Sequence, residues 1–150
     1  MTDTKTVDVL NKLVITSEDG EKGFAEAADL ATDPKLKLLF GECARECHQA
    51  AKELQAEITA TGAKAPDHGS ATGAAHRGWI KLKSTVADTN IALLEEVERG
   101  EDHAKAAYTA ALKARLPAKL KSLVEKQQAG VLRNHDRIRD LRDSYKAARI

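Results

Sequence analysis

The stretch Ala28-Asp29-Leu30-Ala31-Thr32-Asp33-Pro34-Lys35-Leu36 lies between two long helical patterns and decides how they are joined. The Asp33 side chain can accept a hydrogen bond from a free amide at the start of a helix. Proline is favoured at the first helical position because its missing N–H needs no partner there. One helix therefore ends near Ala31 and the next begins at Pro34. A connection this short predicts an antiparallel helical hairpin.

Apolar residues recur at alternating steps of three and four positions on both sides of this break, which is the period of one helix face. The pattern predicts helices over residues 4–31 and 34–61, and Gly62 follows the second as a typical C-terminal residue. The first face contains Val7, Leu10, Val14, Ser17, Glu21, Phe24 and Ala28, and the second contains Leu36, Phe40, Cys43, Cys47, Ala50, Leu54 and Ile58.

A second break, Leu116-Pro117, separates two further helical patterns. They predict helices over residues 89–115 and 117–148, and Asp88 can cap the first of them. The short break again predicts an antiparallel hairpin. The faces read Ile91, Leu94, Glu98, Glu101, Lys105, Tyr108 and Leu112, then Leu120, Val124, Gln127, Val131, Asn134, Ile138, Leu141 and Tyr145.

The connection between the two hairpins, residues 62–87, is long. Residues 62–69 are rich in helix breakers, and Ser70 can cap a short helix over residues 70–86. That helix covers about 25 Å and the coil before it up to about 26 Å, enough to pass helices of roughly 40 Å. We therefore expect a crossover that makes the second and third long helices parallel. The predicted fold is a single all-α domain over residues 1–150, a ferritin-like four-helix bundle.

The composition excludes several classes of protein. Lys and Arg number 24 against 23 Asp and Glu, so the net charge of +1 gives no general attraction to nucleic acid or anionic membranes. No stretch of 18 apolar residues predicts a membrane span, and no signal-peptide core is found in residues 1–12. We expect a cytoplasmic protein whose Cys43 and Cys47 are reduced core residues, and a metal or redox pair is the alternative interpretation. No phosphate-binding loop or catalytic triad pattern is found.

Polar residues interrupt the helix faces at one predicted level of the bundle. Residues that face each other have numbers that sum to about 65 in the first hairpin and about 233 in the second. With a full crossover, this counting brings Glu21, Glu42 or Cys43, Glu98 and His135 to one level. Two carboxylates and an imidazole suit a divalent metal ion such as iron or zinc. The alternative is a structural polar layer, or carboxylates at a wet helix boundary.

Five glycines fall inside the predicted helices, where each costs up to about 1 kcal/mol relative to alanine. They are Gly20, Gly23, Gly41, Gly100 and Gly130. Such glycines either permit close helix approach or admit a bulky side chain, and Trp79 of the crossover is a candidate for one notch. Relaxed packing at a helix bend is the other interpretation.

Four strings carry a resemblance to a known family: Asp19-Gly20-Glu21-Lys22-Gly23-Phe24, His76-Arg77-Gly78-Trp79, Glu98-Arg99-Gly100-Glu101-Asp102 and His135-Asp136-Arg137-Ile138. Over residues 7–143, the chain resembles a bacterial family of four-helix-bundle proteins of unknown function, placed in the ferritin-like superfamily. The superfamily implies a di-iron site with two single glutamates and two Glu-x-x-His motifs.

The ligand set that this resemblance implies is incomplete in this sequence. Glu21 and Glu98 match the single glutamates, and His135 matches one histidine, but the residue three before it is Leu132. The third residue after Glu42 is Arg45, so that helix lacks the motif as well. Oxygen-dependent di-iron chemistry is therefore not expected.

The sequence supports two functional hypotheses. The first is a non-enzymatic interaction or stress-associated protein that forms a dimer or larger homo-oligomer through a flat bundle face. The alternative is a protein that stores, buffers or senses a divalent metal ion, with Glu21, Glu98, His135 and Glu42 as ligands.

Overall fold

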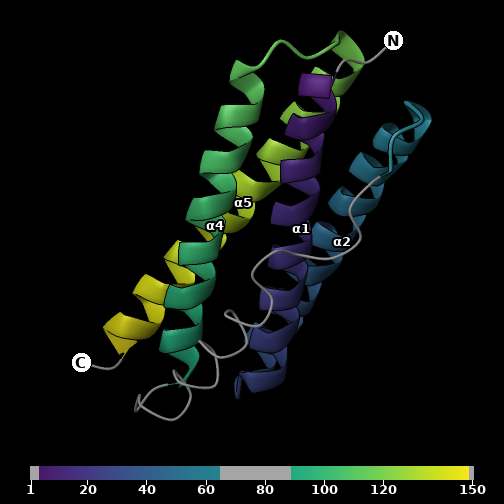
Figure 1. Ribbon diagram of the computed structural model, residues 1–150. Helices are drawn as coiled ribbons and strands as arrows, with labels where there is room; N and C mark the ends of the chain where they lie inside the picture. The colour runs from purple at the N-terminus through teal and green to yellow at the C-terminus, as the bar shows by residue number, and fades with distance from the viewer. Residues whose placement is uncertain (1–3, 65–88, 149–150) are drawn as a thin grey trace.

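The computed structural model describes residues 4–64 and 89–148, which form four long helices and no strand (Figure 1). They are α1 (Thr4–Leu30), α2 (Pro34–Ala60), α4 (Thr89–Lys113) and α5 (Ala118–Ala148). The predicted all-α helical bundle is confirmed, with boundaries within a few residues of those expected. None of the helices in these ranges is long and apolar enough to cross a membrane.

The Asp33-Pro34 break acts as predicted. The Asp33 carboxylate accepts a hydrogen bond from the Lys35 N–H at 2.9 Å, and Pro34 is the first residue of α2. At the other end of α2, Gly62 has a φ of +89°, a conformation that glycine adopts without steric cost. Asp33 and Pro34 thus close the turn between α1 and α2, and Gly62 follows the other end of α2.

Contacts at one end of the bundle show how the two hairpins are oriented. The Thr32 N–H donates to Asn90 Oδ1 at 3.0 Å, and Asn90 Nδ2 donates to Thr32 Oγ1 at 2.9 Å. The Tyr145 hydroxyl of α5 donates to Asp33 in the α1–α2 turn. The start of α4 and the last turns of α5 therefore lie beside that turn.

This orientation makes α2 and α4 parallel, because both start at the same end of the bundle. Helix α1 packs against α2 and α4, and α4 packs against α5, whereas α2 and α5 contact each other much less than these pairs do (Figure 1). The short helix expected over residues 70–86, and with it Trp79, lies outside the described residues.

Two apolar clusters fill the two ends of the bundle. The first cluster surrounds Phe24 and Phe40, whose ring centroids are 6.3 Å apart, and includes Leu94 and Ile138. The second cluster contains Leu10, Leu13, Leu54, Ile58 and Val124, among others. Buried polar side chains lie between the two clusters: Ser17, Glu101, Gln127, Asn134 and His135. The middle of the bundle is therefore the place to look for a functional site, because buried polar and ionisable side chains gather there.

Candidate functional site

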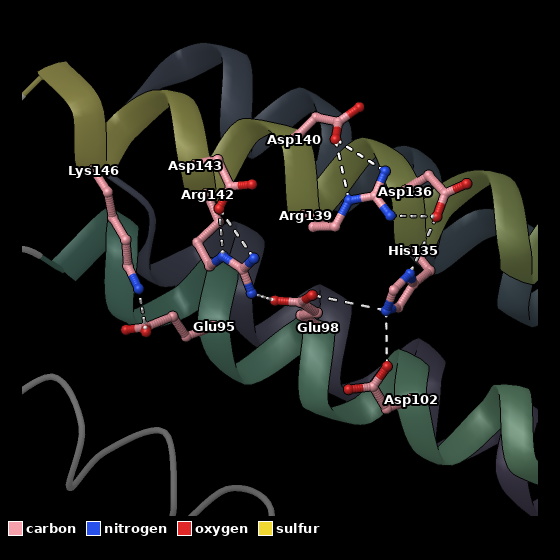
Figure 2. Close-up of polar contacts among 10 residues, drawn as sticks. All are labelled: Glu95, Glu98, Asp102, His135, Asp136, Arg139, Asp140, Arg142, Asp143 and Lys146. Carbon is pink, nitrogen blue, oxygen red and sulfur yellow. Dashed lines mark hydrogen bonds and ion pairs between the residues drawn. The ribbon is translucent and has the colours of Figure 1, made fainter.

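Two of the predicted metal ligands, Glu98 and His135, do lie together. His135 Nε2 is 3.7 Å from Glu98 Oε2 and 2.7 Å from Asp102 Oδ1 (Figure 2). The second oxygen of Glu98 forms an ion pair with Arg142, and His135 Nδ1 is 3.3 Å from Asp136 Oδ1. Glu98 and His135 therefore belong to a group of ion pairs that joins α4 to α5. We call it the α4–α5 ion-pair cluster, and it contains Glu95, Glu98, Asp102, His135, Asp136, Arg142 and Lys146.

The other two predicted ligands lie elsewhere. Glu21 contacts His48 Nδ1 at 3.0 Å, and the two side chains are 36% and 52% exposed. Glu42 lies 3.9 Å from Arg137, and both are more than 40% exposed. The expected convergence of Glu21, Glu42, Glu98 and His135 on one centre is not observed, and this corrects the sequence-based expectation.

The physical reason is the rotation of α1 about its axis. Gly20, and not Glu21, faces α2 at the level of Cys47, where a Cβ added to Gly20 would lie 2.9 Å from the Cys47 sulfur. Adjacent helical positions point about 100° apart. Glu21 is consequently turned away from the bundle axis toward the outer edge of α2.

The environment of Glu98 and His135 does not fit a divalent metal ion. The guanidinium of Arg142 already neutralises Glu98 and would repel a cation placed beside it. Within residues 4–64 and 89–148, no group of three or more His, Cys, Asp or Glu side chains is arranged to hold a metal. The α4–α5 ion-pair cluster is better explained as a connection between two helices.

A cavity of about 460 Å³ lies in the middle of the bundle, and we call it the central cavity. Phe24 and Val97 line it on the side of the first apolar cluster, and Tyr108 and Val131 on the side of the second. Its walls are mostly apolar and come from all four described helices. A cavity of this size and composition matches the pockets that proteins use for small organic molecules.

Four of the helical glycines line this cavity: Gly20, Gly23, Gly100 and Gly130. A Cβ added to Gly100 would meet no heavy atom within 4 Å, so the space beside it is open. Gly20 instead permits close approach of Cys47. Gly20 thus matches the close helix approach that the sequence predicted as one alternative. Gly100 instead borders open space.

A hydrogen-bonded network forms one wall of the central cavity. The Tyr108 hydroxyl donates to Gln127 Oε1 at 2.8 Å and lies 3.4 Å from Ser17 Oγ. Gln127 Nε2 donates to the Ala50 carbonyl and to Glu53 Oε1, each at 3.2 Å. Burial raises the pKa of Tyr108 to about 12, so its hydroxyl stays neutral. Tyr108 and Gln127 in this wall are therefore neutral and already hydrogen-bonded, and Glu53 supplies the acidic group at its outer edge.

Glu101 and Asn134 differ from that wall because each has an oxygen atom without a partner. Both side chains are 5% exposed and line the cavity, and neither Glu101 Oε2 nor Asn134 Oδ1 has a hydrogen-bond partner among the described residues. Burial, followed by the negative charges of Glu46 and Asp102, raises the pKa of Glu101 to about 8. The carboxyl is therefore mostly protonated at neutral pH.

Sequence reasoning placed Glu101 and Asn134 on the inner faces of their helices but selected Glu98 and His135 as the site. The signal that could have found the cavity was the combination of Gly100 beside Glu101 with Gly130 on the facing helix. The size of a cavity depends on how side chains of four helices pack, and no single face reveals it.

The fold and the cavity define the class of protein, a four-helix bundle with a small-molecule-sized space in its core. The sequence pattern of a family described as a domain of unknown function, DUF2383, matches residues 5–114. The chain belongs to that family.

A solved structure shares the fold over nearly its full length. It is the crystal structure of a conserved hypothetical protein, rv2844, from Mycobacterium tuberculosis, with a TM-score of 0.75 and 12% sequence identity. The similarity covers 93% of this chain and 99% of that one. No curated protein matches this chain. These comparisons establish the family and the fold, and the activity has to be inferred from the site.

Proposed function

We propose that this protein is a non-enzymatic binding protein that holds a small organic molecule in its central cavity. The observation that carries the proposal is the cavity itself, about 460 Å³ with mostly apolar walls and a few polar groups. Apolar walls supply affinity, and a small number of fixed polar groups supply orientation. A reaction would need a nucleophile or base that a neighbouring group activates, and the hydroxyl of Tyr108 is neutral and already hydrogen-bonded to Gln127.

The glycines support a binding role over loose packing. Glycine inside a helix costs up to about 1 kcal/mol relative to alanine. At Gly100 an alanine methyl group would meet open space, so steric exclusion does not explain the glycine. Gly100 lies at the exposed edge of the cavity, and space left there for a ligand is the explanation that we propose.

The route into the cavity follows from its exposed lining residues. Glu46 and Gln49 on α2 and Lys126 and Arg133 on α5 are exposed and line the cavity. Because α2 and α5 contact each other only sparsely, we expect a ligand to enter between them. The 3.9 Å ion pair of Lys126 with Glu53 spans this gap, and because the Lys126 side chain is 76% exposed, the pair opposes opening only weakly.

The test uses the neutral dye N-phenyl-1-naphthylamine, which fluoresces strongly in apolar sites. We expect saturable binding of one dye per chain. Gly100→Leu fills part of the cavity and is expected to weaken binding by at least about tenfold, or 1.4 kcal/mol. Gly41→Leu is the matched control, because Gly41 is also helical but does not line the cavity.

Circular dichroism establishes that both variants are folded before binding is compared. Failure of the dye to bind the wild-type protein, or equal binding by Gly100→Leu and Gly41→Leu, would overturn the proposal. The metal-binding alternative stays a prediction from the sequence, and elemental analysis of the purified protein tests it.

A further inference from the structure

We infer that the central cavity selects an organic ammonium ion, a protonated amine on an apolar body, with Glu101 Oε2 and Asn134 Oδ1 accepting its N–H groups. This inference rests on the proposed function and names the chemical class of the ligand. It starts from the two cavity-lining oxygens that lack partners among the described residues.

Asn134 Oδ1 needs a hydrogen-bond donor, and Glu101 Oε2 needs one as well once a cation beside it makes the carboxyl give up its proton. A buried acceptor left without a partner costs about 1–3 kcal/mol, more if it is charged. The carbonyl oxygen of Asn134 can only accept, and an ionised Glu101 can only accept. A ligand with several N–H groups satisfies both, whereas a carboxylate or phosphate ligand would place further acceptors against them.

The orientation of the Asn134 amide is fixed by Glu46. Asn134 Nδ2 donates to Glu46 Oε2, and a carboxylate accepts hydrogen bonds but does not donate them when ionised. The nitrogen must therefore point to Glu46, which leaves Oδ1 as the atom available to a ligand. Glu46 also raises the pKa of Glu101 through its negative charge, so the three residues lie in one region of the cavity.

The charges around this region favour a cation. Glu101 and Glu46 are both acidic, and Glu53 accepts a hydrogen bond from Gln127 at the same wall. The basic side chains that line the cavity, Lys126, Arg133 and His103, are all exposed, and Lys126 is 76% exposed beside Glu53. Glu101 is the buried carboxyl group among the described lining residues, it has no buried basic partner there, and an ammonium ion supplies the missing charge.

The mostly apolar walls determine the rest of the ligand. A metal ion or a small inorganic cation would leave most of the 460 Å³ unfilled. It would also make no apolar contact with Phe24, Val97 and Val131. An amine attached to an aromatic or aliphatic body fills the apolar volume and places its charged group at Glu101. Burial of that body contributes about 25 cal/mol per Å² of apolar surface.

The experiment compares three molecules with the same phenyl body and different head groups: 2-phenylethylamine, 2-phenylethanol and phenylacetate. Isothermal titration calorimetry at pH 7.5 measures each affinity for the wild-type protein. We expect the amine to bind at least about tenfold more tightly than the alcohol, because only the amine is cationic and offers several donors. Phenylacetate is expected to bind least tightly.

Glu101→Gln keeps the volume of the side chain and removes its charge. We expect this variant to lose at least about tenfold in affinity for the amine and to keep its affinity for the alcohol. Asn134→Leu removes the second acceptor. We expect it to lower the affinity for the amine more than the affinity for the alcohol. Glu98→Gln is the matched control, because Glu98 lies one turn away on α4 and does not line the cavity.

The outcomes separate the two proposals. Equal affinity of the wild-type protein for amine and alcohol would overturn the inference and leave the binding function standing. An amine preference that survives Glu101→Gln would place the cation elsewhere and would also overturn it. If neither these molecules nor the dye binds, the proposed function itself fails.

Discussion

Gly20 of α1 and Cys47 of α2 meet so closely that a Cβ added to the glycine would lie 2.9 Å from the cysteine sulfur. This contact sets the rotation of α1 against α2. It also explains why Glu21, the next residue, points away from the bundle axis and pairs with His48.

Gly20→Ala is therefore expected to destabilise the protein, although alanine is the better helix former. The added methyl group overlaps the sulfur, and overpacking of this kind typically costs about 1–3 kcal/mol. Thermal unfolding measures the change. The double variant Gly20→Ala/Cys47→Ala is expected to be more stable than Gly20→Ala, because the overlapping sulfur is gone.

Gly41→Ala is the control for this substitution. The nearest atom to an added Cβ at Gly41 is an Arg45 nitrogen at 3.7 Å, an ordinary contact. We expect this variant to gain up to about 1 kcal/mol from helix propensity. If Gly20→Ala gains as much as Gly41→Ala, the contact with Cys47 does not constrain the helices.

The two cysteines are expected to be unreactive in the folded protein. Burial raises the pKa of Cys43 to about 12, and burial also raises the pKa of Cys47 well above its usual value. Since the thiolate is the reactive form, Ellman's reagent at pH 8 should modify both thiols slowly in buffer and rapidly in guanidinium chloride. Cys43 is buried and Cys47 is half-buried, and rapid reaction of both thiols in the native protein would contradict this shielding.

The ion pairs of the α4–α5 ion-pair cluster are expected to contribute unequally to the stability of the protein. Arg142 pairs with Glu98, which is only 12% exposed, whereas Lys146 pairs with Glu95 at 2.9 Å and both of these side chains are more than 40% exposed. Arg142→Ala leaves a mostly buried carboxylate without its cation and is expected to cost about 1–3 kcal/mol. Lys146→Ala is expected to cost less than about 1 kcal/mol. Urea unfolding of the two variants compares them, and equal costs would show that burial does not distinguish these pairs.

Features encoded by neighbouring residues could be predicted from the sequence. Asp33 and Pro34 start α2 as expected, because capping depends only on the chain around it. Counting from the turns also placed Glu98 level with His135, and these side chains are 3.7 Å apart. Position along a helix is well determined by residue number, because each residue rises by a fixed amount.

Rotation about a helix axis could not be predicted in the same way. A shift of one position, from Glu21 to Gly20, turns the inward direction by about 100° and moved a predicted ligand out of the core. The Arg142 partner of Glu98 was missed because it comes from two turns farther along α5 than His135. The open space at Gly100 was missed because it depends on side chains from the other helices.

Glu101 is expected to make the stability of the protein fall with increasing pH. In the unfolded chain this carboxyl ionises near pH 4.5, whereas in the folded protein burial and Glu46 raise its pKa to about 8. Below pH 4.5 both states hold the proton. Between about pH 4.5 and 8 only the folded state holds it, so each pH unit in that window costs up to about 1.4 kcal/mol.

Glu101→Gln removes the ionisable carboxyl group. The glutamine side chain has nearly the same shape as the protonated carboxyl group, which the folded protein accommodates at low pH. The free energy of unfolding of the variant should therefore exceed that of the wild type by an amount that grows from pH 5 to pH 8, as measured by urea unfolding at intervals of one unit. Glu98→Gln should show no such growing gain, because Glu98 forms an ion pair with Arg142 and this substitution removes that pair. Parallel stability curves for wild type and Glu101→Gln would mean that Glu101 is ionised in the folded protein. The central cavity would then carry a fixed negative charge and not a carboxyl that ionises when a cation arrives.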